Sequence, residues 1–374
     1  FVDGRFAPAV SREVAADGLS VRQLTTAMQT DGTVTADDLI GDEPRHAFDA
    51  LNVALSTAGV HLDVADSAVI DAPVHVIHIF TGRGEPVLAN LRHLVRVGER
   101  AQLTLVTSAF GVPGAVGCLN VTTRARIAAG ATLHHRDLQN QPTSAYHLSL
   151  LEVTQEAQSE LDGFVSTLGG AIARHEVHVR QVGVEANTHI DGLYVPRGEQ
   201  QHDHPILIEH FAEGGVSREI YRGVIDGRGH GVFNGQIVIH PGAQRIDSDQ
   251  SNKNLLLSDT AEADTRPRLL IYADDVKATH GASVGRLDDE QLFYLRSRGV
   301  PEAEARRVLT YAFVAEIVEK VGSGPLHDHV AALVSARLHP DEDTRHAAEV
   351  LAETVPGIDP ETLRPLVAEM LNVL

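Results

Sequence analysis

A long stretch of short apolar runs, from about Val69 to Gly285, most constrains what this chain can fold into. Gly, Asp and Asn turns separate the runs, and no helical periodicity of about ten residues interrupts them. Residues 74–79, 175–179 and 236–240 mostly alternate apolar with polar side chains, as half-buried strands do. The stretch is therefore predicted to be entirely β.

Within this stretch a small residue repeatedly follows a polar, turn-forming one. Several of these pairs lie about 25 to 30 residues apart, which is typical of the coils of a β-solenoid. A β-sandwich or jelly roll also places its strands at regular turn spacing, so the pattern favours the solenoid only slightly. The pairs are Arg100-Ala101, Gly130-Ala131, Glu156-Ala157, Glu185-Ala186, Gly242-Ala243 and Glu262-Ala263.

After Gly285 the pattern becomes helical. Asp288 can cap a first helix that stops at Gly299, and Pro301 can open a second helix with one apolar stripe. Further helices are expected around residues 326–338 and 344–354, and from about residue 359. We therefore divide the chain into a lead-in segment (1–66), a β body (67–286) and a C-terminal helical subdomain (287–374).

Composition restricts the classes of partner. The chain has 51 acidic and 31 basic residues, a net charge of -20 without a long acidic run, so nucleic acid is not an expected partner. No apolar run approaches the roughly 18 residues of a membrane span, and the first residues lack the order of a signal peptide, so a cytoplasmic protein is expected. Cys118 is the only cysteine, so this chain cannot supply a cysteine-rich metal site alone.

The usual enzyme signatures are missing, since there is no phosphate-binding Gly-Lys-Ser/Thr loop and no nucleophile elbow. The strongest alternative is a cupin-like metal-dependent enzyme that uses His202, His204 and Glu209 as ligands. Its second half-motif, near residues 241–242, lacks a histidine at the needed spacing. His175 and His178 are interpreted as exposed strand histidines, because their spacing does not place both on one face of a strand.

Five sequence blocks stand in the order found in the SufB/SufD family of the SUF iron–sulfur cluster assembly system. The chain resembles that family closely over these blocks and more weakly back to its first residues. Within the family, residues 272–282 and the single cysteine resemble the SufD branch. The blocks are residues 217–224 (SREIYRGV), 231–235 (GVFNG), 249–258 (DQSNKNLLLS), 272–282 (YADDVKATHGA) and 292–299 (LFYLRSRG).

The resemblance implies a mainly β fold, a right-handed parallel β-helix with a C-terminal helical subdomain. It implies a scaffold subunit that is not itself an enzyme, pairs with a SufB-like paralogue or a second copy of itself, and docks a SufC-like ABC ATPase. No cofactor is expected to be held stably by this chain alone, and an iron or iron–sulfur cluster is expected to be shared transiently with SufB.

The resemblance also suggests site residues. His280 is the candidate metal ligand, because a neutral imidazole can bind iron while thiolates come from the partner; the alternative is a hydrogen bond in a turn beside Gly281. Ala278 departs from the family, in which cysteine is frequent there, and the helical N-terminal domain that usually precedes the β body is absent from the sequence. Asn252 and Asn254 are expected to hydrogen-bond inside the coils. The candidate interface residues are Asp274, Asp275, Lys277, Phe293, Tyr294 and Arg296.

Overall fold

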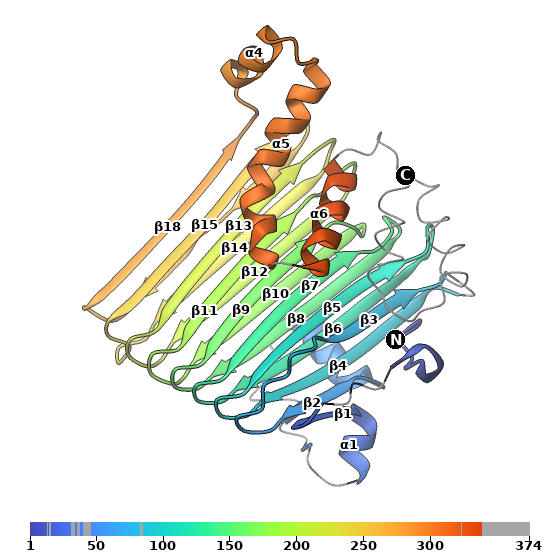
Figure 1. Ribbon diagram of the computed structural model, residues 1–374, viewed down its shortest axis with the longest axis vertical. Coiled ribbons are helices and arrows are strands. Elements are labelled where there is room, and N and C mark those ends of the chain that lie inside the picture. The colour runs from blue at the N-terminus through green and yellow to red at the C-terminus, as the bar shows by residue number, and fades with distance from the viewer. Residues whose placement is uncertain are drawn as a thin grey trace.

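The body of the protein consists of two long β-sheets, through which the chain winds as a solenoid of about eight turns (Figure 1). The computed structural model describes residues 1–338 apart from 13, 15, 31–33, 36–37, 40–45, 83–84 and 323. Strands that are neighbours in a sheet lie one coil apart in the sequence and run parallel, except that β1 pairs antiparallel with β2. The predicted parallel solenoid is confirmed, because a sandwich would pair its strands antiparallel.

The strands of the two sheets alternate along most of the chain. One sheet contains β1 (Leu19–Gln23), β2 (Val60–Val64), β4 (Val87–Val97), β6 (Gly117–Ile127), β8 (Ala145–Gln155), β10 (Ile172–Gln181), β12 (Gln201–His210), β14 (His230–Ile239), β16 (Glu262–Thr265) and β17 (Arg268–Ile271). The other contains β3 (Val74–Phe80), β5 (Gln102–Gly111), β7 (Thr132–Asn140), β9 (Glu160–Thr167), β11 (Asn187–Tyr194), β13 (Val216–Ile225), β15 (Ile246–Leu256) and β18 (Val276–Gly285).

One corner of the coils explains three of the pairs that recur in the sequence, those that end at Ala101, Ala131 and Ala186. In successive coils one residue has a positive φ, and its N–H donates to a carbonyl of the next coil; Arg100 (φ 56°) bonds Ala129, and Glu185 (φ 57°) bonds Glu213. The small residue that follows, such as Ala101 or Ala186, is buried. A small side chain therefore follows the corner residue in most coils, although Ile246 follows Arg245 in the last one. The other corner residues of this kind are Ser67, Gly130, Gln158, Gly214 and Arg245.

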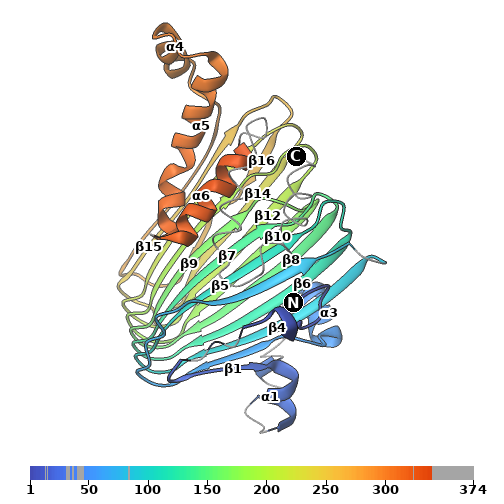
Figure 2. The ribbon, with the colours of Figure 1, turned by 45° about the vertical axis from the view of Figure 1, so that its right-hand side comes forward.

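The C-terminal helices are α4 (Asp289–Ser297), α5 (Glu302–Val318), the short η2 (Glu319–Val321) and α6 (Pro325–Leu338). Helices α5 and α6 lie against the outer face of the sheet that contains β9 and β11, whereas α4 stands beyond the end of the solenoid (Figures 1 and 2). Val314 and Ile317 of α5 share a buried cluster with Phe164 and Leu193 of that sheet. The helices expected beyond residue 338 lie outside the described residues, and the three-part division of the chain remains a prediction.

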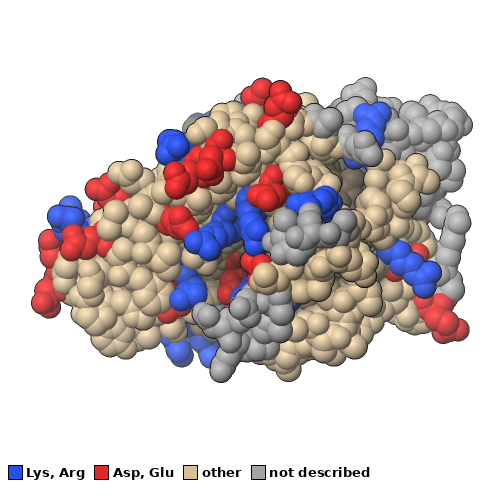
Figure 3. Space-filling view, turned by 90° about the horizontal axis from the view of Figure 1, so that it is seen from below, with Lys and Arg blue, Asp and Glu red and all other residues tan. Residues whose placement is uncertain are grey.

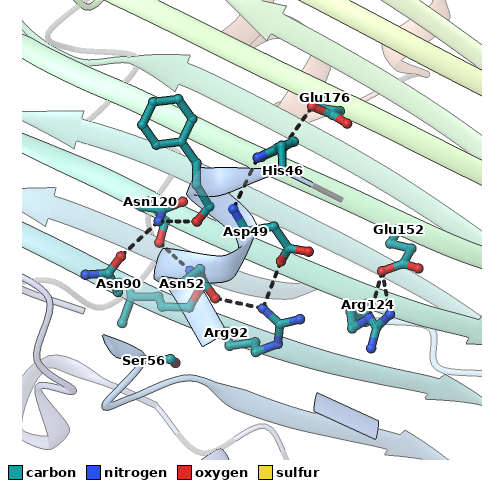
Figure 4. A network of polar contacts seen from close by, with 12 residues as sticks. His46, Asp49, Asn52, Ser56, Asn90, Arg92, Asn120, Arg124, Glu152 and Glu176 are labelled. Atoms are coloured by element: carbon teal, nitrogen blue, oxygen red, sulfur yellow. Dashed lines mark hydrogen bonds and ion pairs between the residues drawn. The ribbon is translucent and has the colours of Figure 1, made fainter. Parts of the chain in front are cut away.

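A short helix near the N-terminus is held against the outer face of the other sheet. This helix, α3 (Ala47–Leu55), follows η1 (Pro8–Val10) and α1 (Leu24–Thr30). Arg92 of β4 is buried beneath it, and its Nη1 lies 3.3 Å from Asp49 Oδ1 and donates to Asn52 Oδ1 at 2.9 Å (Figure 4). The Asn52 amide donates in turn to the carbonyls of Leu91 and Asn120. A buried polar network therefore fixes α3 on β4 and β6.

Removing one partner of this buried ion pair is predicted to destabilise the protein strongly. Asp49→Ala leaves the Arg92 charge buried without its carboxylate, which typically costs about 3 to 5 kcal/mol. Glu156→Ala is the matched control, because it removes the partner of Arg126, whose side chain is 70% exposed, and should cost less than about 1 kcal/mol. Urea unfolding of the two variants and the parent gives both values. Equal losses in the two variants would contradict the prediction.

Candidate functional site

The solenoid ends at β18, which is an edge strand of the eight-stranded sheet. Along its ten residues β18 pairs with β15 on one side, and no described strand pairs with it on the other. Most of its residues are exposed, including Ala282 and Val284, which the register places on the inward face of the sheet. An edge of this length presents free N–H and C=O groups and is a template for pairing. This open end of the solenoid is the first part of the candidate site.

His280, the candidate metal ligand, lies on this edge strand. It is exposed, and its register partner on β15 is Gln250. Because side chains paired in register share a face of the sheet, His280 belongs to an inward column that continues to Gln250 and then Glu219. The structure therefore places His280 in a strand at the mouth of the solenoid interior, not in a turn.

The turn that precedes β18 carries the acidic candidate residues. Asp274 and Asp275 are exposed, as is Lys277 at the start of the strand. The backbone N–H of Asp275 donates to Gln244 Oε1 at 2.9 Å, and its carbonyl accepts from the backbone N–H of Arg245 at 2.6 Å. Asp275 thus fixes the last corner of the solenoid, while all three side chains remain accessible beside the open end.

The helical candidates lie on α4, away from the solenoid. Phe293 and Tyr294 are 73% and 56% exposed, and Arg298 lies 3.4 Å from the centre of the Tyr294 ring. Arg296 forms an exposed ion pair with Glu302 of α5 at 3.4 Å. Tyr294 also lines a mainly apolar cleft between α4 and α5, together with Leu295, Val308 and Leu309. The structure therefore separates the predicted interface residues into two surfaces, one at β18 and one on α4 and α5.

Buried histidines inside the solenoid were missed by the sequence analysis. His135, His147 and His175 are fully buried and line, with Asp137, a cavity of about 10 Å³, which is close to the space that one water needs. Burial lowers the pKa of His135 and of His147 to about 3, so both imidazoles are neutral at physiological pH. The available signal was the alternation of histidines with apolar residues along the strands. This alternation does not show which face of a strand points into the solenoid.

The interpretation of His175 and His178 as exposed was wrong. His175 faces the interior, where its Nδ1 contacts the Ser149 hydroxyl. His178 faces outward but is also buried, and its Nε2 lies 2.8 Å from Glu209 Oε2. The two side chains point to opposite faces of β10, as their odd spacing predicted, and both faces are covered at these positions.

Asn252 and Asn254 bond within the coils, as predicted. The Asn254 amide donates to Asn252 Oδ1 at 2.7 Å, the Asn252 amide donates to the Tyr194 hydroxyl at 3.0 Å, and that hydroxyl donates to Asn254 Oδ1 at 2.5 Å. The three buried side chains form a closed ring of hydrogen bonds. Next to it, a Cβ at Gly192 would overlap the ring of Tyr221, so glycine is needed there for the large inward side chain.

Glu219 is the most strongly perturbed carboxyl near the open end. It is fully buried, and burial raises its pKa to about 8, although the Gln250 amide donates to its Oε2 at 2.7 Å. Desolvation therefore outweighs the hydrogen bond, and the Glu219 carboxyl is mainly protonated at neutral pH.

The cupin-like ligand set is not brought together. His202 and His204 face the interior of the solenoid, where His204 stacks on Tyr194 with ring centres 4.8 Å apart. Glu209 faces outward and contacts His178 and His240. Its odd spacing from the two histidines places it on the other face of β12, so the three cannot bind one metal ion. Among the described residues no group of three or more His, Cys, Asp or Glu could hold a metal ion.

Two further observations concern partners. On the face shown in Figure 3, Lys and Arg side chains lie among Asp and Glu side chains. Among the described helices, none has both the length and the apolar character required to cross a membrane.

Comparison with known proteins gives a consistent result. The family model for the SUF system FeS cluster assembly, SufBD core domain, matches residues 79–313. The chain is 33% identical over 342 residues to the iron-sulfur cluster assembly protein SufD of Escherichia coli, covering 90% of this chain and 78% of that protein. It is 27% identical over 281 residues to SufD of Bacillus subtilis, covering 74% of this chain and 63% of that protein. It is 31% identical over 272 residues to a SufBD family protein of Mycobacterium tuberculosis, covering 71% and 68% of the two chains.

The raised pKa of Glu219 predicts a pH-dependent stability. The folded state retains the proton up to a pKa of about 8, whereas the unfolded state releases it near 4.5, so the free energy of unfolding falls as pH rises between these values. The slope from this group is about 1.4 kcal/mol per pH unit. Glu219→Gln should remove that contribution, which urea unfolding of the variant and the parent between pH 5.5 and 8.5 would measure.

Asp38→Asn is the control for this measurement. Burial raises the pKa of Asp38, but hydrogen bonds from Thr35 and Arg96 outweigh it and hold that pKa below its usual range, so the carboxyl is ionised in both states throughout this pH range. Because Thr35 and Arg96 do not titrate in this range, its loss should change the stability by nearly the same amount at each pH. If the free energy of unfolding of Glu219→Gln differed from that of the parent by the same amount at every pH, Glu219 would be ionised in the folded protein, and the prediction would be wrong.

Proposed function

Because this chain belongs to the SufB/SufD family of the SUF iron–sulfur cluster assembly system, as a SufD-type member, we propose that it is a scaffold subunit on which a cluster is assembled. It pairs with a SufB-like paralogue at the open end of the solenoid and docks a SufC-like ABC ATPase through α4 and α5. ATP hydrolysis belongs to that ATPase, and this chain is not itself an enzyme. The observation that carries the proposal is the exposed edge strand β18, with His280 on it.

Pairing at β18 follows from the chemistry of the edge. A ten-residue strand with one side unpaired can accept a further strand, and main-chain hydrogen bonds then provide much of the affinity. Two apolar side chains on the inward face of this strand, Ala282 and Val284, are exposed to solvent. A partner that has the same two-sheet cross-section can cover both the strand edge and this interior, which favours a paralogue over an unrelated protein.

Docking of the ATPase is proposed for the second surface. Phe293 is 73% exposed on α4, beside the apolar cleft that Tyr294, Leu295 and Val308 line. Exposed aromatic side chains beside an apolar cleft are typical anchors of a protein interface. This surface includes α4, which stands beyond the end of the solenoid, so a large globular ATPase can occupy it while β18 is paired.

His280 is proposed as a ligand for iron or for a nascent cluster, which is cargo and not a resident cofactor. A neutral imidazole suits iron, but a cluster takes about four ligands, mostly thiolates. Cys118, the only cysteine, lies on β6, whereas His280 lies on the last strand of the solenoid. The remaining ligands must therefore come from the partner, and the cargo is bound between the two chains.

Two variants test the two surfaces and serve as controls for each other. Ala282→Arg places a charged side chain at the open end and should abolish co-purification with the SufB-like partner, because the charge would be buried in the interface. Phe293→Asp removes an exposed anchor and should abolish co-purification with the ATPase. Each variant should keep the other partner, since the two surfaces are separate, and both positions are exposed, so the fold should be retained. Retention of both partners by either variant would contradict its assignment.

His280→Ala tests the proposed role in handling iron. Because the side chain is exposed, the loss should change the free energy of unfolding by less than about 0.5 kcal/mol and leave both partners bound. Iron and sulfide recovered with the purified complex should fall several-fold. Thr279→Ala, on the neighbouring exposed position of β18, is the control. If the His280→Ala complex retains as much iron and sulfide as the parent complex, the ligands belong wholly to the partner.

A further inference from the structure

Behind His280 lies a buried polar column that the proposed function does not use. Glu219, Gln250 and His280 occupy successive inward positions on β13, β15 and β18. Neighbouring strands lie about 4.8 Å apart, so a glutamine and a histidine in register are within reach of each other. Glu219 and Gln250 are both fully buried, whereas His280 is exposed.

The orientation of the Gln250 amide is fixed on its buried side. Its Nε2 donates to Glu219 Oε2 at 2.7 Å, and Gly235 of the opposite sheet makes room for it, because a Cβ there would overlap the amide. Gln250 Oε1 is buried and has no hydrogen-bond partner among the described residues. Such an oxygen is costly to leave unsatisfied, and a donor is expected to reach it. The next side chain in the column is His280.

We propose that Gln250, oriented by Glu219, is the positioning residue of His280: its Oε1 accepts one ring N–H of the imidazole and leaves the other ring nitrogen free to bind a metal ion. Histidines that bind metals commonly donate their second N–H to a carbonyl or carboxylate, which fixes the tautomer and the ring orientation. The column therefore provides, from inside the solenoid, a hydrogen-bond acceptor that orients an otherwise exposed histidine. The inference rests on the proposed function of His280 and adds the residue that prepares it.

The tautomer of His280 tests this arrangement in the full chain without any metal. The histidines are labelled with ¹⁵N, and the signals of His280 are assigned by comparison with the His280→Ala variant. The spectrum then gives the chemical shifts of its two ring nitrogens. The measurement is made at pH 9.5, more than one unit above the pKa of about 8 of Glu219, so that its carboxylate is mainly ionised and can only accept, which fixes the amide orientation. The parent should show one dominant tautomer. Gln250→Met, of similar shape but without the amide, should show a mixture, whereas Ser248→Ala, on the same face of β15, should keep the parent tautomer.

Iron recovered with the partner complex is the second measurement. Loss of such a supporting residue typically weakens metal affinity about 10-fold or more, so the Gln250→Met complex should retain less iron than the parent complex and Ser248→Ala as much. An even mixture of tautomers in the parent chain would overturn the inference even if Gln250→Met failed to fold, and so would an unchanged tautomer in that variant. If the His280→Ala complex retained as much iron as the parent complex, the proposed role of His280 would be wrong. The tautomer measurement would still show whether Gln250 positions the imidazole.

Discussion

Parallel, in-register stacking of the coils is the constraint on which the rest of this structure depends. Each strand bonds to the strand one coil earlier and one coil later, so a position in one coil fixes the environment of the same position in the next. The chain must satisfy that repeat at its corners, where residues such as Arg100 and Glu185 adopt positive φ, and in its interior, where side chains line up in columns. A stacked solenoid also has ends, and at the end near β18 no described strand continues the pairing beyond β18 in one sheet or beyond β16 and β17 in the other.

The interior columns are more polar than a β core requires. Histidines line the inside of the middle coils, and nearer the open end Tyr194, Asn252 and Asn254 form a closed ring while Glu219 and Gln250 form a pair. Each buried polar group costs free energy unless it is bonded, so this arrangement sacrifices stability that Leu or Val columns would provide. The column that contains Glu219 leads to His280, which connects the polar interior to an edge strand that no described strand pairs with on its other side.

The C-terminal helices pack against the outward-facing residues of the repeating strands. Apolar residues on the outward positions of β9 and β11, such as Phe164 and Leu193, bury α5 and α6 against one sheet face. The other sheet is covered near its start by α3 through the buried pair of Arg92 and Asp49. Because the helices cover faces and not the end, α4 and β18 remain accessible at the same time. The architecture thus keeps these two exposed surfaces separate.

The sequence by itself determined the local structure and the family. Alternation and turn spacing predicted the β body, Asp288 and Pro301 predicted the starts of α4 and α5, and the ordered blocks from residue 217 to residue 299 indicated the SufB/SufD family. Only the tertiary structure decided which face of each strand is buried, because period-two alternation fixes relative and not absolute orientation. That is why His175 and His178 were interpreted as exposed. The grouping of Glu209 with His202 and His204 was a different error, because its odd spacing from both histidines already places it on the other face of a strand. The alignment of Glu219 and Gln250 behind His280 also depended on register, since these residues lie about 30 positions apart and meet only when successive coils stack.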